Sequence, residues 1–358
     1  MILIAGIVLA FSFAGCGDGG GDSSSSGAGN GEGDGGTTSD PTIYVAGEYY
    51  SSGDGLGCYW KNGEKKDLLP TGTVGSYAGS IYVAGGSVYV AGSYDDGANG
   101  YACYWKDGIM TDLHPAGADY SWAESIFVTG GSVYVTGNYY ISGSIKACYW
   151  KDETKTDITN GTSPAINSLF VTGVNVYLAG SYRNGGFDKA CYWKDGVKTD
   201  LSGGDKDSSA ASIYVAGTNI YVAGYYYDLT YGGNIACYWK DGVKTDLTPS
   251  TGTESYDSSS IYVAGGSVYV TASCFDGSNF KSCYWIDGTL KDLEAPAGDY
   301  NTFAESIYVL GTTVYIAGCY QDAISNESKA CYWKNGTKVN LHPTGADESY
   351  AYSIFVVE

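Results

Sequence analysis

Ten cysteines and two histidines are the residues of this sequence that most readily do chemistry. Seven of the cysteines open a short Cys-Tyr-Trp motif, which recurs along the chain at Cys58, Cys103, Cys148, Cys191, Cys237, Cys283 and Cys331. Such a row suits reactive thiols, a series of ligand-binding rings, or a repeated structural strand. A disulfide needs Cα atoms within about 7 Å of each other, and equivalent positions of neighbouring repeats should lie farther apart. We therefore expect small, buried packing residues.

The remaining chemistry is sparse. Cys274 ends one predicted strand and Cys283 lies in the next, so we predict a local disulfide between them. The alternative disulfide partners of Cys319 are Cys331 in its own repeat and Cys274 in the preceding one. His114 and His342 occupy matching places in "LHPAGAD" and "LHPTGAD", which indicates an echo of the repeat rather than a base and its partner. No G-x-S-x-G, H-E-x-x-H or P-loop pattern occurs. The sequence predicts no catalytic residues.

The elements that must position these residues are short strands. The motif tryptophans follow one another at intervals of 43 to 48 residues, at Trp60, Trp105, Trp150, Trp193, Trp239, Trp285 and Trp333. Each repeat has the form of four strands: "SIYV", "VYVAGSY", "ACYWK" and "MTDL" in the second copy, with an Asp-Gly hairpin signal between the last two. Both faces of the first two strands are apolar, which is typical of blades that pack on one another.

The order of the strands indicates a closed ring. The chain begins on a second strand, "IYVAGEY" at 43–49, and ends on a first strand, "SIFVV" at 353–357. If these two pair, the C-terminal strand completes the three N-terminal strands as one blade. An open β-solenoid would need capping repeats. We predict an all-β fold, a seven-bladed β-propeller with four-stranded blades.

Loops of variable length should gather on one face of this ring. The turns after the first and third strands are short and share one face, and the longer connections share the other. Binding residues concentrate on variable loops of a rigid scaffold. The candidate ligand-binding residues are therefore aromatic and acidic loop residues: Tyr77, Tyr120, Trp122, Tyr256, Tyr300, Phe303, Tyr350, Asp95 and Asp96. An alternative is that the aromatic residue three before the repeat serine (Tyr77, Trp122, Phe303, Tyr350) fills the gap between blades.

Rings beside carboxylates suit a glycan or a protein partner. We expect no cofactor; loop aspartates are Ca²⁺ ligands elsewhere, but "DDGANG" is typical of a turn. A net charge of −20 argues against nucleic acid, whose phosphates need clustered Lys and Arg. Two other functions stay open. One is a hydrolase or lyase that attacks polysaccharide with loop carboxylates, although turn chemistry explains each carboxylate. The other is a structural envelope scaffold.

The first forty residues have a different character. Residues 1–15 are an apolar run that is too short to span a bilayer as a helix and ends in small residues, so we predict a secretory signal peptide. "FAGC" resembles the lipobox of bacterial lipoproteins, and this resemblance implies lipidation of Cys16. Residues 16–41, rich in Gly, Ser and Asp, form a predicted disordered linker with a reach of about 25–30 Å. The propeller occupies 42–358. The residue after the cysteine is Gly17 rather than an Asp that would favour retention in the inner membrane, which favours a location in the outer membrane.

The repeat "ACYWKDGVKTDL" is similar to the HAF-type extracellular repeats of bacteria, although Cys and Tyr replace the Phe and Leu of that pattern. This resemblance implies a surface location and a repeat architecture, and no activity. The expectation from the sequence is therefore a lipid-anchored propeller of the bacterial envelope. It would be attached to the membrane by its anchor alone, and would bind a glycan or protein without chemistry of its own.

Overall fold

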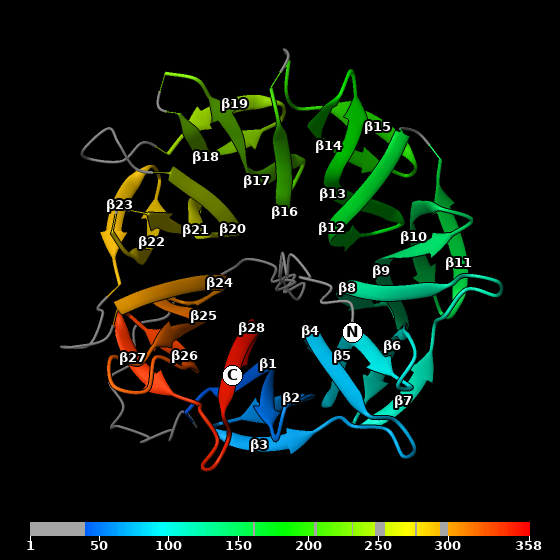
Figure 1. Ribbon diagram of the computed structural model, residues 1–358. Helices are drawn as coiled ribbons and strands as arrows, with labels where there is room; N and C mark the ends of the chain where they lie inside the picture. The colour runs from blue at the N-terminus through cyan, green and yellow to red at the C-terminus, as the bar shows by residue number, and fades with distance from the viewer. Residues whose placement is uncertain are drawn as a thin grey trace, which may run out of the picture.

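Seven four-stranded antiparallel sheets surround a central axis like the blades of a propeller (Figure 1). The computed structural model describes residues 40–159, 162–203, 206–230, 232–247, 255–275, 278–293 and 300–358, without the side chains of 255–257 and 300. The predicted seven-bladed β-propeller is confirmed. None of the helices in this described part is long and apolar enough to cross a membrane.

Each blade runs from an innermost strand at the axis to a short fourth strand at the rim. The innermost strands are β4 (Gly75–Ala84), β8 (Tyr120–Thr129), β12 (Thr162–Thr172), β16 (Ser208–Ala216), β20 (Ser255–Ala264), β24 (Tyr300–Leu310) and β28 (Glu348–Val357). The second strands are β1 (Thr42–Ser51), β5 (Ser87–Asp95), β9 (Ser132–Ile141), β13 (Asn175–Asn184), β17 (Asn219–Asp228), β21 (Ser267–Phe275) and β25 (Thr313–Gln321). The third strands are β2 (Asp54–Lys61), β6 (Gly100–Lys106), β10 (Ser144–Lys151), β14 (Phe187–Lys194), β18 (Gly233–Lys240), β22 (Phe280–Ile286) and β26 (Ser328–Lys334). The fourth strands are β3 (Glu64–Asp67), β7 (Ile109–Asp112), β11 (Thr154–Ile158), β15 (Val197–Asp200), β19 (Val243–Asp246), β23 (Thr289–Asp292) and β27 (Thr337–Asn340).

The ring is closed as the strand order predicted. Strand β28 pairs antiparallel with β1, in a register that sets Tyr44 opposite Phe355, and the sheet order is β28-β1-β2-β3. We call this sheet blade 1. Blades 2 to 7 follow in chain order as β4–β7, β8–β11, β12–β15, β16–β19, β20–β23 and β24–β27.

The Asp-Gly signal of the repeat is a two-residue turn that also caps a neighbouring strand. The first turn residue, Asp or Asn, has a φ of 45–51° in all seven blades, which these residue types tolerate well. Its Oδ1 accepts the backbone N–H of the second residue of the second strand, at 2.8–2.9 Å. One example is Asp107, which accepts from Val88. The turn residue thus has a structural role in every copy.

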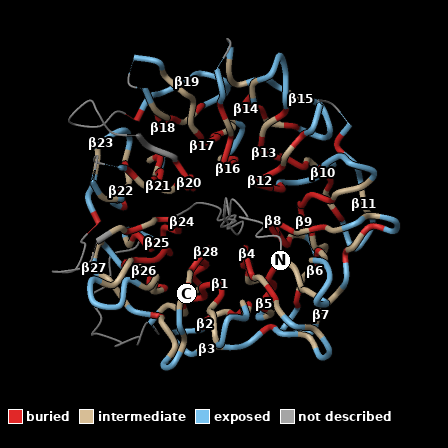
Figure 2. Tube along the Cα trace, viewed as in Figure 1, coloured by how far each residue is buried: buried red, intermediate tan, exposed pale blue. Residues whose placement is uncertain are grey.

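The repeat serine and the Cys-Tyr-Trp motif hold the blades together. In six of the seven junctions the serine Oγ accepts a backbone N–H from the next blade at 2.8–3.3 Å, as Ser80 does from Ile126. The motif Trp and Cys side chains are buried in every blade, and Figure 2 shows how burial concentrates inside the blades. Burial raises the pKa of the Cys103 thiol well above its usual range. The thiols are therefore packing residues, as expected, and not a row of nucleophiles.

Every innermost strand carries a β-bulge immediately before the repeat serine. The ladder shifts register there in all seven blades, for example between Ala78 and Ser80. The bulge brings a carbonyl against the second strand, and a Cβ on Gly92 would lie 1.8 Å from the Tyr77 oxygen. This contact explains the glycine of "VYVAGSY". It also places one extra residue per blade beside the axis, and the type of this residue varies among the blades.

The two faces of the ring differ as the loop lengths predicted. The short-turn face carries the turns after the first and third strands of each blade. The long-loop face carries the other connections. The chain enters on the short-turn face, because Thr42 lies opposite Val357 and the Ile43 carbonyl accepts from the Asn62 turn.

Candidate functional site

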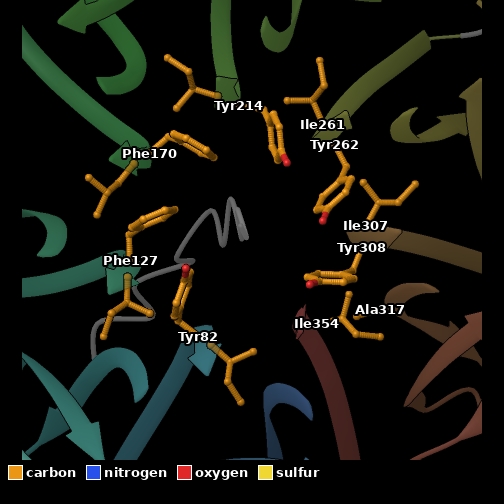
Figure 3. Close-up of a cluster of buried hydrophobic side chains, with 14 of the residues drawn as sticks. Tyr82, Phe127, Phe170, Tyr214, Ile261, Tyr262, Ile307, Tyr308, Ala317 and Ile354 are labelled. Atoms are coloured by element: carbon orange, nitrogen blue, oxygen red, sulfur yellow. The ribbon is translucent and has the colours of Figure 1, made fainter. Parts of the chain in front are cut away.

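The central channel is narrowed by a closed ring of seven aromatic side chains, one from each innermost strand. Neighbouring ring centroids lie 4.8–5.1 Å apart all the way round. Figure 3 shows the rings of Tyr82, Phe127, Phe170, Tyr214, Tyr262 and Tyr308 around the axis. The ring of Phe355 completes the circle between Tyr308 and Tyr82. Each ring comes from the third position of the "SIYV" segment. The seven rings pack on one another around the channel.

On the short-turn side of this ring the channel opens into a wide mouth. A cavity of about 1080 Å³ is lined there by Tyr82, Tyr262, Tyr308 and the Gly-rich turns. Its wall is built largely from turn backbone that is alike in most blades. The mouth offers few side chains that could select a ligand.

The predicted residues Tyr77 and Asp95 meet on the long-loop face. With Tyr50 and Tyr94 they line a cavity of about 230 Å³ between blades 1 and 2. The Tyr77 ring lies 5.2 Å from that of Tyr352 in the neighbouring blade. Tyr77 thus both fills the gap between blades and lines a cavity, so the two interpretations of this position are compatible.

Other predicted aromatic residues form local stacks. Tyr120 stacks on Tyr140 at 4.9 Å and lies 5.9 Å from the Trp122 ring. Phe303 contacts Phe280 of the preceding blade at 5.2 Å, and Tyr350 lies 6.1 Å from Tyr352. Tyr256 and Tyr300 lie in β20 and β24, but their side chains are outside the described part of the chain. The rings that the structure describes are therefore distributed over several blades and form no single aromatic platform.

The loop aspartates are occupied by turns, as the sequence indicated. The Asp95 carboxylate accepts the N–H of Gly97, and that of Asp96 accepts from Ala98, Asn99 and the Tyr101 hydroxyl. These backbone donors lower the pKa of Asp96. Within the described residues, no group of three or more His, Cys, Asp or Glu could hold a metal ion.

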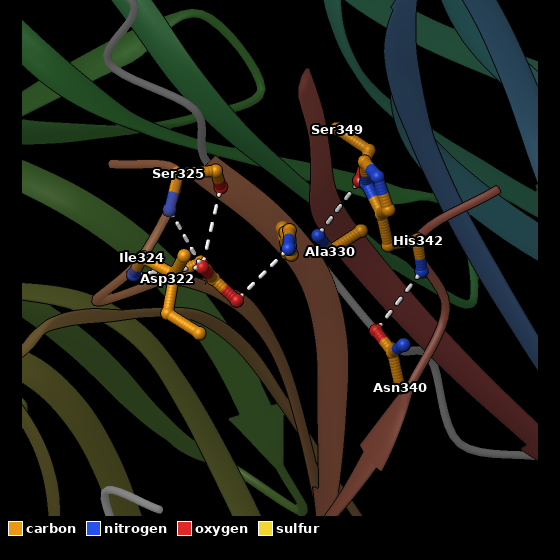
Figure 4. A network of polar contacts seen from close by, with 8 residues as sticks. Asp322, Ile324, Ser325, Ala330, Asn340, His342 and Ser349 are labelled. Atoms are coloured by element: carbon orange, nitrogen blue, oxygen red, sulfur yellow. Dashed lines mark hydrogen bonds and ion pairs between the residues drawn. The ribbon is translucent and has the colours of Figure 1, made fainter. Parts of the chain in front are cut away.

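Asp322 shows the same behaviour in blade 7 (Figure 4). Its carboxylate accepts the N–H groups of Ile324 and Ser325 and pairs with Lys329 at 2.9 Å. These donors hold the pKa of Asp322 well below its usual value, with the Ser325 N–H the largest cause. The carboxylate organises its own loop.

The two histidines also occupy equivalent structural positions. His114 Nδ1 lies 2.9 Å from Ser121 Oγ, and His342 Nδ1 lies 2.8 Å from Ser349 Oγ (Figure 4). Each of these serines accepts an N–H of the third strand, as Ser349 does from Ala330. The histidines are structural links between a connection and its blade, which agrees with the repeat echo expected from the sequence.

The predicted disulfide between Cys274 and Cys283 is absent from the structure, where both residues are buried thiols. Cys274 lies opposite Lys281, and Cys283 opposite Ala272. The two cysteines are therefore diagonal neighbours on one face of the sheet, at a typical separation of about 7–8 Å. That is too far for a disulfide. Lipidation of Cys16 concerns a residue outside the described part.

Three buried or half-buried glutamates near the axis were not predicted. Glu124 and Glu305 are the bulge residues of β8 and β24, and Glu48 lies in β1. Burial raises the pKa of each to about 7. The Tyr352 hydroxyl donates to Glu48 at 2.6 Å, and the Trp122 indole donates to Glu124 at 2.5 Å.

The acidic candidates from the sequence were loop residues and did not include these strand carboxyl groups. For Glu124 and Glu305 the signal in the sequence was the residue just before the repeat serine. Glutamate stands there twice, in "AES", whereas the other copies have Gly79, Asn167, Ala211, Ser259 and Tyr352. Without the bulge, alternation along the strand gives no reason to single this position out.

A further cavity, of about 430 Å³, lies where blade 4 joins blade 5 on the long-loop face. The polar and aromatic residues of its lining are Ser202, Lys206, Asp207, Ser208, Tyr226, Tyr227, Asp228, Thr230, Trp239 and Lys244. We call it the blade 4–5 cavity. Its volume lies in the range of small-molecule sites. The sequence candidates did not include any of these residues.

Comparisons with known proteins bear on the fold alone. No family model matches the chain, and no curated protein sequence matches it. The structure is similar to Pyrococcus horikoshii acylaminoacyl peptidase, with 12% identity and a TM-score of 0.51 over 85% of this chain and 52% of that chain. This chain thus spans about half of that protein. A nidogen/laminin complex matches with 13% identity and a TM-score of 0.40, over 88% of this chain and 98% of that chain. An exo-1,5-alpha-L-arabinanase from a bovine ruminal metagenomic library matches with 12% identity and a TM-score of 0.35, over 71% and 94%.

Proposed function

We propose that this protein is a lipid-anchored binding module of the bacterial envelope, whose long-loop face recognises a glycan without chemical change. The observation that carries the proposal is the separation of the two faces. The chain enters at the short-turn face, so an anchor at Cys16 and its linker would hold that face toward the membrane. The variable loops would then point away from the membrane, toward external ligands.

Hollows on the long-loop face favour a glycan over a flat protein partner. Two cavities there, of about 430 and 230 Å³, are lined by tyrosines, serines and aspartates. A specific protein interface usually buries about 800 Å² per partner and has an apolar core. The exposed large apolar side chains of this face, such as Leu69, Leu229 and Ile324, are scattered over different blades.

Glycan arrays and affinity capture from envelope extracts test the proposal with the purified full chain. We expect a restricted set of bound glycans and no release of reducing sugar from them. Clean negatives on all glycans, together with a stoichiometric envelope protein, would overturn the glycan ligand and favour the scaffold alternative. The anchor has its own test: palmitate incorporation that is lost in Cys16→Ala.

Polysaccharide hydrolysis is the second candidate, because the carboxyl groups of Glu124 and Glu305 have a pKa of about 7, as a general acid requires. Both are half-buried beside the axis. If the chain is a hydrolase, Glu124→Gln or Glu305→Gln should abolish turnover and leave binding intact. Absence of turnover on every glycan that the protein binds rejects this candidate.

A further inference from the structure

At the blade 4–5 cavity, two side chains that fill the corresponding space between blades 2 and 3 are replaced. At the junction of blades 2 and 3, Tyr120 lies opposite Tyr140 across the strand pair and stacks on it at 4.9 Å, with the ring planes 5° apart. At the junction of blades 4 and 5, the equivalent of Tyr140 is Tyr227. The residue opposite it is Asp207, whose backbone carbonyl accepts the Tyr227 N–H.

The second replacement is at the connection itself. His114 bridges Ser121 Oγ and the Ala118 carbonyl at 2.9 and 3.2 Å, so its imidazole occupies the connection between blades 2 and 3. The equivalent residue between blades 4 and 5 is Ser202, which reaches Ser208 Oγ at 2.7 Å. The polar link to the strand is kept, but the volume of the imidazole is lost.

The lining that remains has a tyrosine ring and balanced charges. Tyr227 is half-buried, and among the described residues no aromatic ring stacks on it. Lys206 and Lys244 are matched in charge by Asp207 and Asp228. An ionic ligand would find no net opposite charge in this cavity. An uncharged ligand with many hydroxyl groups would find both donors and acceptors.

Some of the lining is already committed to the blade. Lys244 lies 3.4 Å from the centre of the Tyr226 ring and 2.9 Å from Asp246, in an arrangement that other blades repeat. Asp207 Oδ1 accepts the Asp188 N–H, and Asp228 Oδ1 accepts that of Thr230. The parts that are particular to this junction are Ser202, the second oxygen of Asp207, the exposed Lys206 and the Tyr227 ring.

We propose that the blade 4–5 cavity binds one uncharged sugar residue of the glycan, with its ring against Tyr227 and its hydroxyl groups toward Lys206 and Asp207. This inference rests on the proposed glycan-binding function and gives that function a location. Stacking of an apolar sugar face on an aromatic ring needs a ring that no other ring covers, and among the described residues none stacks on Tyr227.

Two substitutions close the cavity with side chains that the same protein uses elsewhere. Asp207→Tyr copies Tyr120 over Tyr140, and Ser202→His copies His114 at Ser121. Asp54→Tyr is the matched control: it makes the same change of side chain at the exposed first residue of β2, on the same face and outside this cavity. Thermal unfolding of each variant shows whether the fold is retained, and Ser202→His keeps the test valid if Asp207→Tyr unfolds.

The probes are the methyl glycosides of glucose, galactose, mannose and N-acetylglucosamine, measured by saturation-transfer NMR on the full chain. We expect at least one to bind the wild type and Asp54→Tyr equally. Binding should be at least tenfold weaker in Asp207→Tyr and Ser202→His. Tyr227→Phe, which keeps the ring face, should retain binding, and Tyr227→Ala should lose it.

The outcomes separate this inference from the proposed function. A glycoside that binds the wild type and both closing variants equally overturns the cavity assignment and leaves a glycan-binding module with its site elsewhere. If none of the four glycosides binds the wild type, the assignment of a single uncharged sugar is wrong, whether or not longer glycans bind on the array. If the array is also negative, both proposals fail.

Discussion

At the short-turn face all seven blades present a turn that begins with Asp or Asn and makes the same hydrogen bond; six of these turns are Asp-Gly or Asn-Gly, and blade 3 has Asp152-Glu153. The junctions of the long-loop face, by contrast, differ in length and in sequence. Between blades 2 and 3 that face is filled by His114 and Tyr120. Between blades 4 and 5 it is left open by Ser202 and Asp207. The repeated half therefore carries the stability of the ring, and the varied half carries whatever selects a ligand.

The largest expected effect tests the repeated half at its most buried side chain. Trp193→Ala should lower the free energy of unfolding by about 3–5 kcal/mol, because it removes a fully buried indole and leaves a cavity. Urea unfolding measures the change. Val197→Ala, at a side chain 68% exposed in the same blade, is the control and should be close to neutral. A loss below about 1 kcal/mol for Trp193→Ala would contradict this role.

The next effect belongs to the varied half, through the bulge glutamates. The folded-state pKa of Glu124 and Glu305 is about 7, above that of an unfolded glutamate, so the folded protein binds more protons between roughly pH 4.5 and 7. Their contribution to stability is complete below that window and is lost as the pH rises through 7. The thermal midpoint should therefore be higher at pH 5 than at pH 8.

The double variant Glu124→Gln, Glu305→Gln isolates these two groups. It should flatten the pH dependence of the thermal midpoint, because the amides do not titrate, although Glu48 remains. Asp96→Asn, at an exposed turn with a lowered pKa, should leave the slope in this window unchanged. An unaltered slope in the double variant would show that the bulge carboxyl groups are solvated.

A smaller effect is expected at the turns. Asp107→Ala should destabilise the protein by about 1–2 kcal/mol, because alanine tolerates the positive φ poorly and leaves the Val88 N–H without its acceptor. Asp107→Asn should be close to neutral in the same urea titration, since Asn62 and Asn335 perform this role in blades 1 and 7. Equal losses in the two variants would mean that the negative charge, not the cap, matters.

The smallest effect concerns the lysine that follows the motif tryptophan. In six blades this lysine lies 5.3–5.8 Å from a tyrosine ring of the second strand, as Lys106 does from Tyr89. Blade 6 places Ile286 opposite Tyr269 instead. Lys106→Ile should therefore cost less than about 1 kcal/mol, as expected for an exposed cation–π contact. A loss of the size seen for Asp107→Ala would mean that the lysine has a further partner.

The architecture could be predicted because its signals are local and occur seven times. Alternation in "SIYV", the Asp-Gly turn and the order of strands at the two ends together indicated a closed ring of seven blades. The roles of the thiols, the histidines and the loop aspartates also followed from their recurrence. Each of these conclusions needed only the spacing of residues within one repeat.

The candidate site was less accessible from sequence, because it depends on contacts between repeats. The bulge before the repeat serine places Glu124 and Glu305 beside the axis, and the alternation of residues along the strand does not predict a bulge. The blade 4–5 cavity depends on two residues being smaller or more polar than their equivalents, Ser202 for histidine and Asp207 for tyrosine. The disulfide prediction was wrong because it also depended on the pairing register of two strands. Cys274 and Cys283 share a face of the sheet but are diagonal neighbours rather than opposite each other.

The closure of the ring by β28 also governs how this chain folds. The contact between Glu48 and Tyr352 joins residues 304 positions apart, and the whole β1–β28 ladder has a similar separation. Contacts this distant form late, because a long loop must close before they contribute. Until then β1 has an unpaired edge that can recruit a strand of another chain. Blade 1 is therefore where slow folding, and the aggregation that competes with it, should be sought.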